Sequence, residues 1–120
     1  MNGVFVNHTN HPSAQWSEEQ KNAARSFGEL VDVPFPAVSS SASREQVLKL
    51  VDEQLSAILK LSPSAVLCQG EYTFAMVEQL KRREIPAMAA CSERVVEEFI
   101  AEDGSTQRLS NFRFVRFRLY

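Results

Sequence analysis

Short apolar runs alternate along this chain with stretches of helical periodicity, and this alternation constrains the fold more than any other feature. The apolar runs fall at residues 4–6, 30–33, 65–68 and 85–91. Three helical stretches separate them. Two begin at Ser17 and Ser43, each followed by a glutamine in a capping-box pattern, and the third covers about residues 71–83. Strand–helix–strand units of this length join parallel strands by right-handed crossovers. The sequence therefore predicts an α/β fold with a parallel four-stranded core and crossover helices.

The C-terminal part changes period and predicts an antiparallel β-hairpin. Asp103-Gly104 separates two strand-like stretches, residues 95–100 and 108–120. Strict alternation in the last stretch would place aromatic residues on both faces. A β-bulge near Phe114 or Val115 would instead gather the apolar side chains on one side and leave the arginines together. Both arrangements are open, the bulge being favoured, and the hairpin is expected to extend or cap one edge of the sheet.

Length and composition predict a single domain over residues 1–120. The chain is 44% hydrophobic and 23% charged, with a net charge of -2, so we expect no long nucleic acid as a partner. Four arginines crowd the C-terminal stretch, either as a solvated face or as a local anion-binding or partner-binding strip. They are Arg108, Arg113, Arg116 and Arg118.

No segment predicts membrane association or export. The longest apolar runs fall far short of the ~20 residues that a membrane span needs. Residues 1–4 lack the pattern of a signal peptide. Cys68 and Cys91 lie inside apolar runs, where a thiol behaves as a small hydrophobic group. A reduced, cytoplasmic protein is expected.

Polar residues cluster where three of the predicted strands end. Loops at the carboxyl ends of parallel strands form the ligand crevice of an open α/β sheet. We therefore expect these clusters to surround one binding site. The first cluster contains Asn7, His8, Thr9, Asn10, His11 and Ser13, the second Gln69, Gly70, Glu71, Tyr72 and Thr73, and the third Ser92, Glu93 and Arg94.

The first cluster carries both histidines of the chain. Imidazole is the side chain best suited to proton transfer near neutral pH, and the asparagines and hydroxyls can hydrogen-bond an anionic or sugar-bearing ligand. A hydrogen-bonded turn built by Asn10 and Ser13 explains the same residues equally well. A zinc site would need a carboxylate or cysteine cluster, which is missing unless Cys91 or Glu93 joins. We expect no metal and no cofactor.

The other two clusters offer phosphate contacts. Gly70 lets a backbone approach closely, and the N–H groups at the start of the following helix could accept a phosphate. Capping of that helix is the simpler role for Glu71 and Thr73. Arg94 could clamp a phosphate bidentately, or pair with a neighbouring glutamate.

Taken together, the clusters supply two imidazoles, one guanidinium and hydrogen-bond donors, without an acidic pair for magnesium. This inventory predicts recognition of a phosphate-containing ligand. Metal-independent cleavage of an RNA-like phosphodiester follows naturally, since the 2′-hydroxyl is its own nucleophile. In this hypothesis His8 or His11 acts as base or acid, and Arg94 with the Gly70 amides holds the phosphate.

The three polar clusters and the closing hairpin resemble small CRISPR-associated proteins with a Rossmann-like fold related to CARF domains. The resemblance covers most of the chain in layout and is specific in residues 7–13, 68–71 and 90–94. It implies a single CARF-like domain that binds cyclic oligoadenylate, and a ring-nuclease activity in antiviral defence. It also implies a homodimer, because a cyclic ligand would match two copies of the same loops across a twofold axis.

Two other functions remain open from sequence. The domain could bind the nucleotide without cutting it, as a sensor or sink, or it could be a protein-interaction module that uses Arg113, Arg116 and Arg118. In the enzyme hypothesis, His8→Ala, His11→Ala and Arg94→Ala are expected to weaken turnover or binding and to leave the fold intact.

Overall fold

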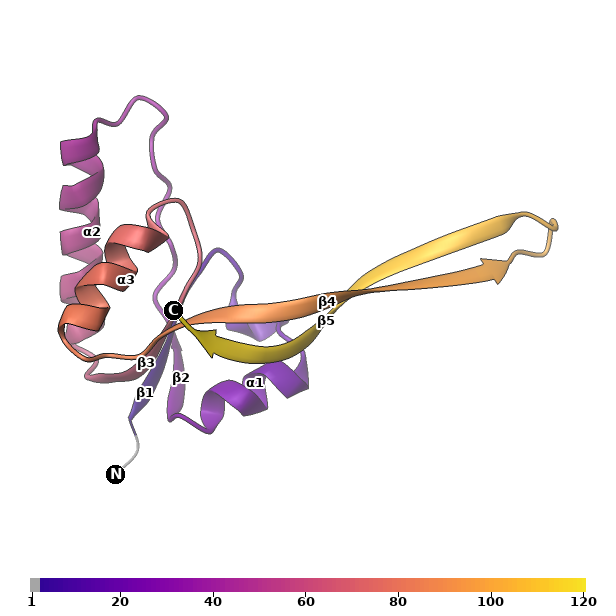
Figure 1. The fold of residues 1–120 in the computed structure, drawn as a ribbon, viewed down its shortest axis with the longest axis horizontal. Coiled ribbons are helices and arrows are strands. Elements are labelled where there is room, and N and C mark those ends of the chain that lie inside the picture. Colours follow the sequence, from indigo (N-terminus) through magenta and orange to yellow (C-terminus); the bar gives the residue numbers. More distant parts are fainter. Residues whose placement is uncertain (1–2) are drawn as a thin grey trace.

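The computed structural model describes residues 3–120 and shows one five-stranded mixed sheet in the order β2-β1-β3-β4-β5 (Figure 1). Strands β2, β1, β3 and β4 are parallel, and β5 runs antiparallel to β4. The strands are β1 (Val4–His8), β2 (Glu29–Asp32), β3 (Pro63–Cys68), β4 (Ala87–Ile100) and β5 (Thr106–Leu119). The helices are α1 (Glu18–Arg25), α2 (Arg44–Leu59) and α3 (Thr73–Arg82), with a 3-10 turn η1 (Ser13–Gln15). The predicted Rossmann-like α/β fold with a C-terminal hairpin is confirmed.

Helices cover both faces of the parallel core, which explains why its strands read as continuous apolar runs. Val6 and Val66 face α2 and α3 and pack in one cluster with Ile58. Phe5 faces the opposite side and packs with Ala24 of α1. Neighbouring residues of β1 are therefore both fully buried.

Both predicted serine caps are present. The Ser43 hydroxyl accepts a hydrogen bond from the Gln46 backbone N–H, and the Gln46 side chain accepts one from the Ser43 N–H, which completes the capping box of α2. Ser17 likewise accepts from the Gln20 N–H at the start of α1.

The fourth strand is longer than predicted. It was expected to end at Cys91, but β4 continues to Ile100 and pairs with β3 only at Ala87 and Met88. Beyond that point β4 pairs with β5 alone, and the two form a ribbon that projects from the body of the protein (Figure 1). The polar residues after Cys91 resemble a loop in the sequence. They can nevertheless continue the strand, because the backbone hydrogen bonds of a solvent-exposed ribbon do not require buried apolar side chains. We call the ribbon formed by residues 92–114 the arm.

The predicted hairpin and its bulge are both confirmed. The strands are joined by residues 101–105, where the Asp103 carboxylate accepts hydrogen bonds from the Ser105 N–H and hydroxyl. Cys91 lies opposite Arg116 and Ser92 opposite Phe114, so Val115 is the extra residue. The bulge places Phe112, Phe114 and Phe117 on the α1 side of the ribbon. Arg113 and Arg116, which lie between these phenylalanines in the sequence, are on the other face of the ribbon.

Two further predictions concern membrane association and a targeting signal. No helix within residues 3–120 has the length and hydropathy needed to cross a membrane. Met1 and Asn2, which belong to the segment searched for a targeting signal, lie outside the described residues.

Candidate functional site

A hollow of about 1030 Å³ lies where the arm leaves the body, on the α1 side of the sheet. This size is typical of a ligand-binding cleft. Its walls come from the loop after β1, from η1 and the start of α1, from the end of β3, and from β4 and β5. The lining residues are Thr9, His11, Gln15, Trp16, Ser17, Glu18, Glu19, Gln20, Leu67, Gln69, Ala90, Ser92, Phe112, Arg113 and Phe114.

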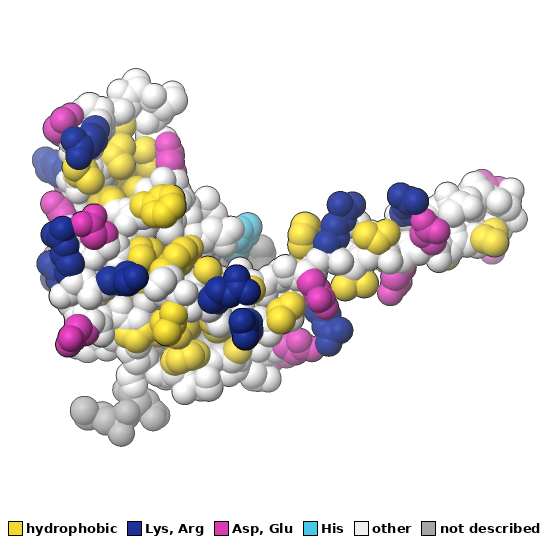
Figure 2. Space-filling view, in the orientation of Figure 1, with side chains coloured by type: hydrophobic (Ala, Val, Ile, Leu, Met, Phe, Trp, Pro, Cys, Tyr) yellow, Lys and Arg dark blue, Asp and Glu magenta, His cyan; other side chains and the backbone are white. Residues whose placement is uncertain are grey.

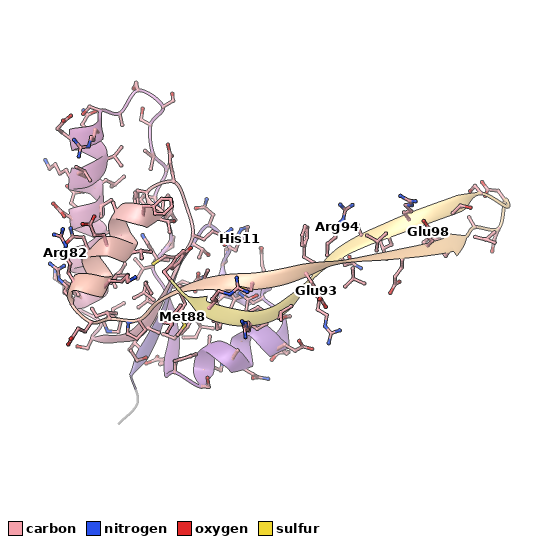
Figure 3. The ribbon with its side chains drawn as sticks, viewed as in Figure 1. His11, Arg82, Met88, Glu93, Arg94 and Glu98 are labelled. Atoms are coloured by element: carbon pink, nitrogen blue, oxygen red, sulfur yellow. The ribbon has the colours of Figure 1, made fainter. Side chains whose placement is uncertain are left out.

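Each of the three predicted polar clusters contributes to this hollow. Thr9 and His11 come from the first cluster, Gln69 from the second and Ser92 from the third. Strands β1 and β3 end at the same edge of the sheet, where β4 leaves the parallel core, and this arrangement brings these residues together. Figure 3 shows His11 beside the root of the arm, and Arg94 farther out along it.

His8 does not line the hollow, because it belongs to β1 and is only 1% exposed. Its Nδ1 lies 2.7 Å from the Val33 carbonyl oxygen, and its Nε2 lies 2.7 Å from the Tyr72 hydroxyl. Burial lowers the pKa of His8, although the bond to the Val33 carbonyl opposes this effect. His8 is therefore a neutral, fully paired core residue. Of the two predicted acid–base candidates, only His11 faces the hollow.

Asn7 is also buried, and it organises the loop that follows β1. Its Nδ2 donates to the Asp32 carboxylate at 3.1 Å and to the His11 carbonyl at 2.9 Å, while its Oδ1 accepts from the Thr9 hydroxyl at 2.8 Å. Asp32 in turn accepts from the Ser13 backbone N–H. The predicted hydrogen-bonded turn therefore exists, but Asn7 and Asp32 build most of it. Asn10 is exposed and does not line the hollow.

The main chain of His11 is held firmly while the residue itself is exposed. The His11 carbonyl accepts hydrogen bonds from Asn7 Nδ2 and from the indole N–H of Trp16, and its own N–H donates to the Thr9 hydroxyl at 3.0 Å. This arrangement fixes where the imidazole is attached and leaves the ring open to a ligand. A proton-transfer residue needs such positioning.

In the second cluster, only Gln69 lines the hollow. A Cβ added to Gly70 would lie 2.3 Å from a ring carbon of Phe35, so the missing side chain is explained by the packing of Phe35. The Thr73 hydroxyl donates to the Gly70 carbonyl at 2.7 Å and does not cap the helix. Glu71 is exposed. The phosphate contact predicted for the Gly70 amides therefore has no support in the lining of the hollow.

The third cluster is divided between the two faces of the arm. Ser92 lies on the same face as Phe114, its partner across the ribbon. Arg94 lies on that face too, opposite Phe112, with its Nε donating to the Ser110 hydroxyl at 2.7 Å. Glu93 points to the opposite side, as Figure 3 shows, where it faces Arg113 across the ladder. Arg94 thus lies next to the hollow without lining it.

Sequence reasoning missed the aromatic part of the site. Trp16, Phe112 and Phe114 line the hollow from segments that are far apart in the chain. In the sequence, Trp16 only precedes the predicted helix start at Ser17, and the two phenylalanines belong to the predicted C-terminal strand. Their spacing gave no signal of a shared site, because the arm had to fold back past α1 to bring them together.

The remaining candidate nucleophiles and metal ligands do not gather at this site. Burial raises the pKa of the Cys68 thiol to about 12, so it stays protonated. No group of three or more histidine, cysteine, aspartate or glutamate side chains within residues 3–120 is arranged to hold a metal ion. The residues that line the hollow supply one imidazole, one arginine (Arg113), hydroxyls, amides, carboxylates and aromatic rings.

A protein-family model described as "Uncharacterized protein MJ1673 family" matches residues 3–118. No curated protein and no solved structure matches the chain.

Proposed function

We propose for this chain, which belongs to the uncharacterized MJ1673 protein family, that the hollow binds a cyclic oligoadenylate and cleaves it without a metal ion. The protein would then act as a ring nuclease in CRISPR antiviral signalling. One observation carries the proposal: Thr9 and His11 after β1, Gln69 after β3 and Ser92 within β4 line one hollow.

The lining has the chemistry that an adenine nucleotide requires. Trp16 and Phe114 offer aromatic faces on which a base can stack, an interaction of about 1–3 kcal/mol per base. Glu18 and Glu19 can accept hydrogen bonds from the adenine amino group, and Gln69 can both donate and accept. A polar group paired with a base edge would give selectivity for adenine.

The proposed reaction uses the nucleotide's own 2′-hydroxyl. His11 removes the proton of this hydroxyl, the oxygen attacks the adjacent phosphorus, and the bond from phosphorus to the 5′-oxygen breaks. The leaving oxygen takes a proton from water, and the product ends in a 2′,3′-cyclic phosphate. Arg94, beside the hollow, stabilises the charge that develops on the phosphate oxygens.

Incubation with cyclic tetra-adenylate and cyclic hexa-adenylate tests this proposal. We expect linear products with 2′,3′-cyclic phosphate ends, formed equally with and without EDTA and identified by chromatography with mass spectrometry. His11→Ala should lower the turnover rate by about 10²-fold or more, as expected for loss of a general base. Arg94→Ala should weaken turnover, whereas Arg116→Ala, on the opposite face of the ribbon and outside the lining, is the matched control.

A second function has one observation in its favour. The hollow contains a single imidazole because His8 is buried, so no pair of histidines is available as separate acid and base. A sensor or sink that binds the same ligand without cleaving it needs no such pair. Binding in calorimetry without products in the cleavage assay would select this function, and absence of binding to both rings would reject both functions.

A further inference from the structure

The arm exposes large apolar side chains on both faces. In Figure 2, hydrophobic side chains lie along the whole arm with charged ones between them. Phe112 is 80% exposed and Ile100 76%, and Val96, Phe99 and Leu109 are each about half exposed. Several exposed large apolar side chains on one element of a soluble protein indicate an interaction site.

The arm also lacks support from the rest of the fold. Beyond Met88, β4 has β5 as its only neighbour in the described sheet. A two-stranded ribbon by itself is marginally stable in water and gains stability when a face is covered. The outer edge of each strand also leaves backbone N–H and C=O groups without a partner strand, and such edges favour association with another chain.

One face of the arm exposes more apolar surface than the opposite face, and its charges form a self-complementary pattern. Along β4 this face carries Ser92, Arg94, Val96, Glu98 and Ile100, and the matching β5 residues include Phe112 and Arg108. Arg94 lies on one side of Val96 and Glu98 at the same separation on the other. We call this surface the Val96 face.

We propose that the Val96 faces of two copies of this chain pack against each other, antiparallel, about a twofold axis that passes near Val96. A twofold contact repeats every pair, so Arg94 of each copy meets Glu98 of the other. The same register sets Arg108 of one copy over the Phe112 ring of the other, a cation–π arrangement. The two Val96 side chains meet at the axis. Within each arm the Arg108 Nε already lies 2.8 Å from the Glu98 carboxylate, so Arg94 of the other copy joins an existing ion pair.

This packing also reaches the hollow. The register that brings Arg94 to Glu98 places Ile100 of one copy over Ser92 of the other, and Ser92 lines the hollow. The tip of each arm therefore forms part of the rim of the other copy's hollow. The contact itself does not depend on the function proposed above, since it rests on the arm alone.

The area of the Val96 face limits the expected affinity of the dimer. Nine residues of each strand span about 30 Å, and a ribbon of two strands is about 10 Å wide. This face is smaller than the ~800 Å² per partner of a standard interface. Because the face covers only about 300 Å² per partner, we expect a weak dimer with a dissociation constant on the order of 100 μM, which sedimentation velocity between about 10 and 500 μM resolves.

The first test is the oligomeric state of the full chain. The wild-type protein should sediment as a dimer at the upper end of this range and dissociate on dilution. Ile100→Glu, which adds a charge at an exposed position of the Val96 face, should be monomeric throughout the range. Phe99→Glu, one residue away on the opposite face, is the matched control and should still dimerise. Circular dichroism verifies that both variants keep the wild-type fold.

Cross-linking identifies the face. In a Cys91→Ser background, Val96→Cys should be joined to a dimer by a short bis-maleimide, because packed ribbons lie about 10 Å apart. Phe99→Cys should not be cross-linked, since its side chain points away from the partner. A wild-type chain that stays monomeric at all concentrations would overturn the proposal, as would equal cross-linking from both positions, which indicates edge-to-edge pairing or another occupant.

Discussion

Nε2 of His8 and the hydroxyl of Tyr72 are 2.7 Å apart, and their rings stack with centroids separated by 5.8 Å. Because the Val33 carbonyl can only accept, His8 Nδ1 must carry the proton, and Nε2 then accepts from Tyr72. Burial raises the pKa of the Tyr72 hydroxyl, so it remains a donor. This chain of bonds joins the ends of β1 and β2 to the start of α3.

Tyr72→Phe should destabilise the fold by removing this donor. The His8 Nε2 would be left buried without a partner, which costs about 1–3 kcal/mol. Urea unfolding measures the loss. Tyr120→Phe is the control, because the Tyr120 hydroxyl donates to the Cys68 carbonyl but the residue is 45% exposed and water can replace the bond. Equal losses from the two variants would contradict the role of the His8–Tyr72 contact.

The lowered pKa of His8 predicts that stability decreases in mild acid. Below the ordinary histidine pKa of about 6.5, the unfolded chain binds a proton that the folded protein excludes. The free energy of unfolding should therefore be constant above this pH with respect to His8. It should fall by at most about 1.4 kcal/mol per pH unit below it, until the pH reaches the folded pKa.

Urea unfolding between pH 7.5 and 5.5 tests this dependence. The chain has two histidines, so His11→Ala leaves His8 as the only imidazole, and the decrease in mild acid should persist in this variant. A flat profile in this variant would show that His8 is not responsible.

Gly70→Ala should be more damaging than the same change at Gly104. Gly70 has a φ of +151° and would place a Cβ 2.3 Å from the Phe35 ring, whereas Gly104 has a φ of +83° and nothing within 4 Å. The Gly104 change should cost about 1 kcal/mol for its backbone conformation. The Gly70 change adds a steric conflict of about 1–3 kcal/mol. Thermal unfolding of both variants compares them, and equal shifts would mean that Phe35 moves aside freely.

The two histidines should separate stability from activity. His8→Ala removes a buried, doubly bonded ring, so we now expect a loss of about 3 kcal/mol in stability instead of an intact fold. His11→Ala changes an exposed residue and should alter stability by no more than about 0.5 kcal/mol. Under the proposed function, His11→Ala still loses turnover. Full turnover in this folded variant would remove its role as a base.

Much of the fold could be predicted because local signals and burial agree. The runs around Phe5 and Val66 are apolar since helices cover both faces of the sheet, and Ser43 begins its helix through bonds to a residue only three positions away. The bulge at Val115 was predictable too, because alternation alone would have placed phenylalanines on both faces. The end of β4 was not, since an exposed ribbon and a loop have similar composition.

The sequence by itself determined the succession of strands and helices along the chain, the helix caps, the hairpin and the edge of the sheet where polar loops meet. Only the tertiary structure decided which of those polar residues face a ligand. His8 and His11 are three positions apart in the same cluster, yet one lies between Val33 and Tyr72 and the other beside Trp16. Local sequence sets backbone conformation. The exposure of a side chain depends on segments that arrive from elsewhere in the chain, and no spacing within a cluster encodes them.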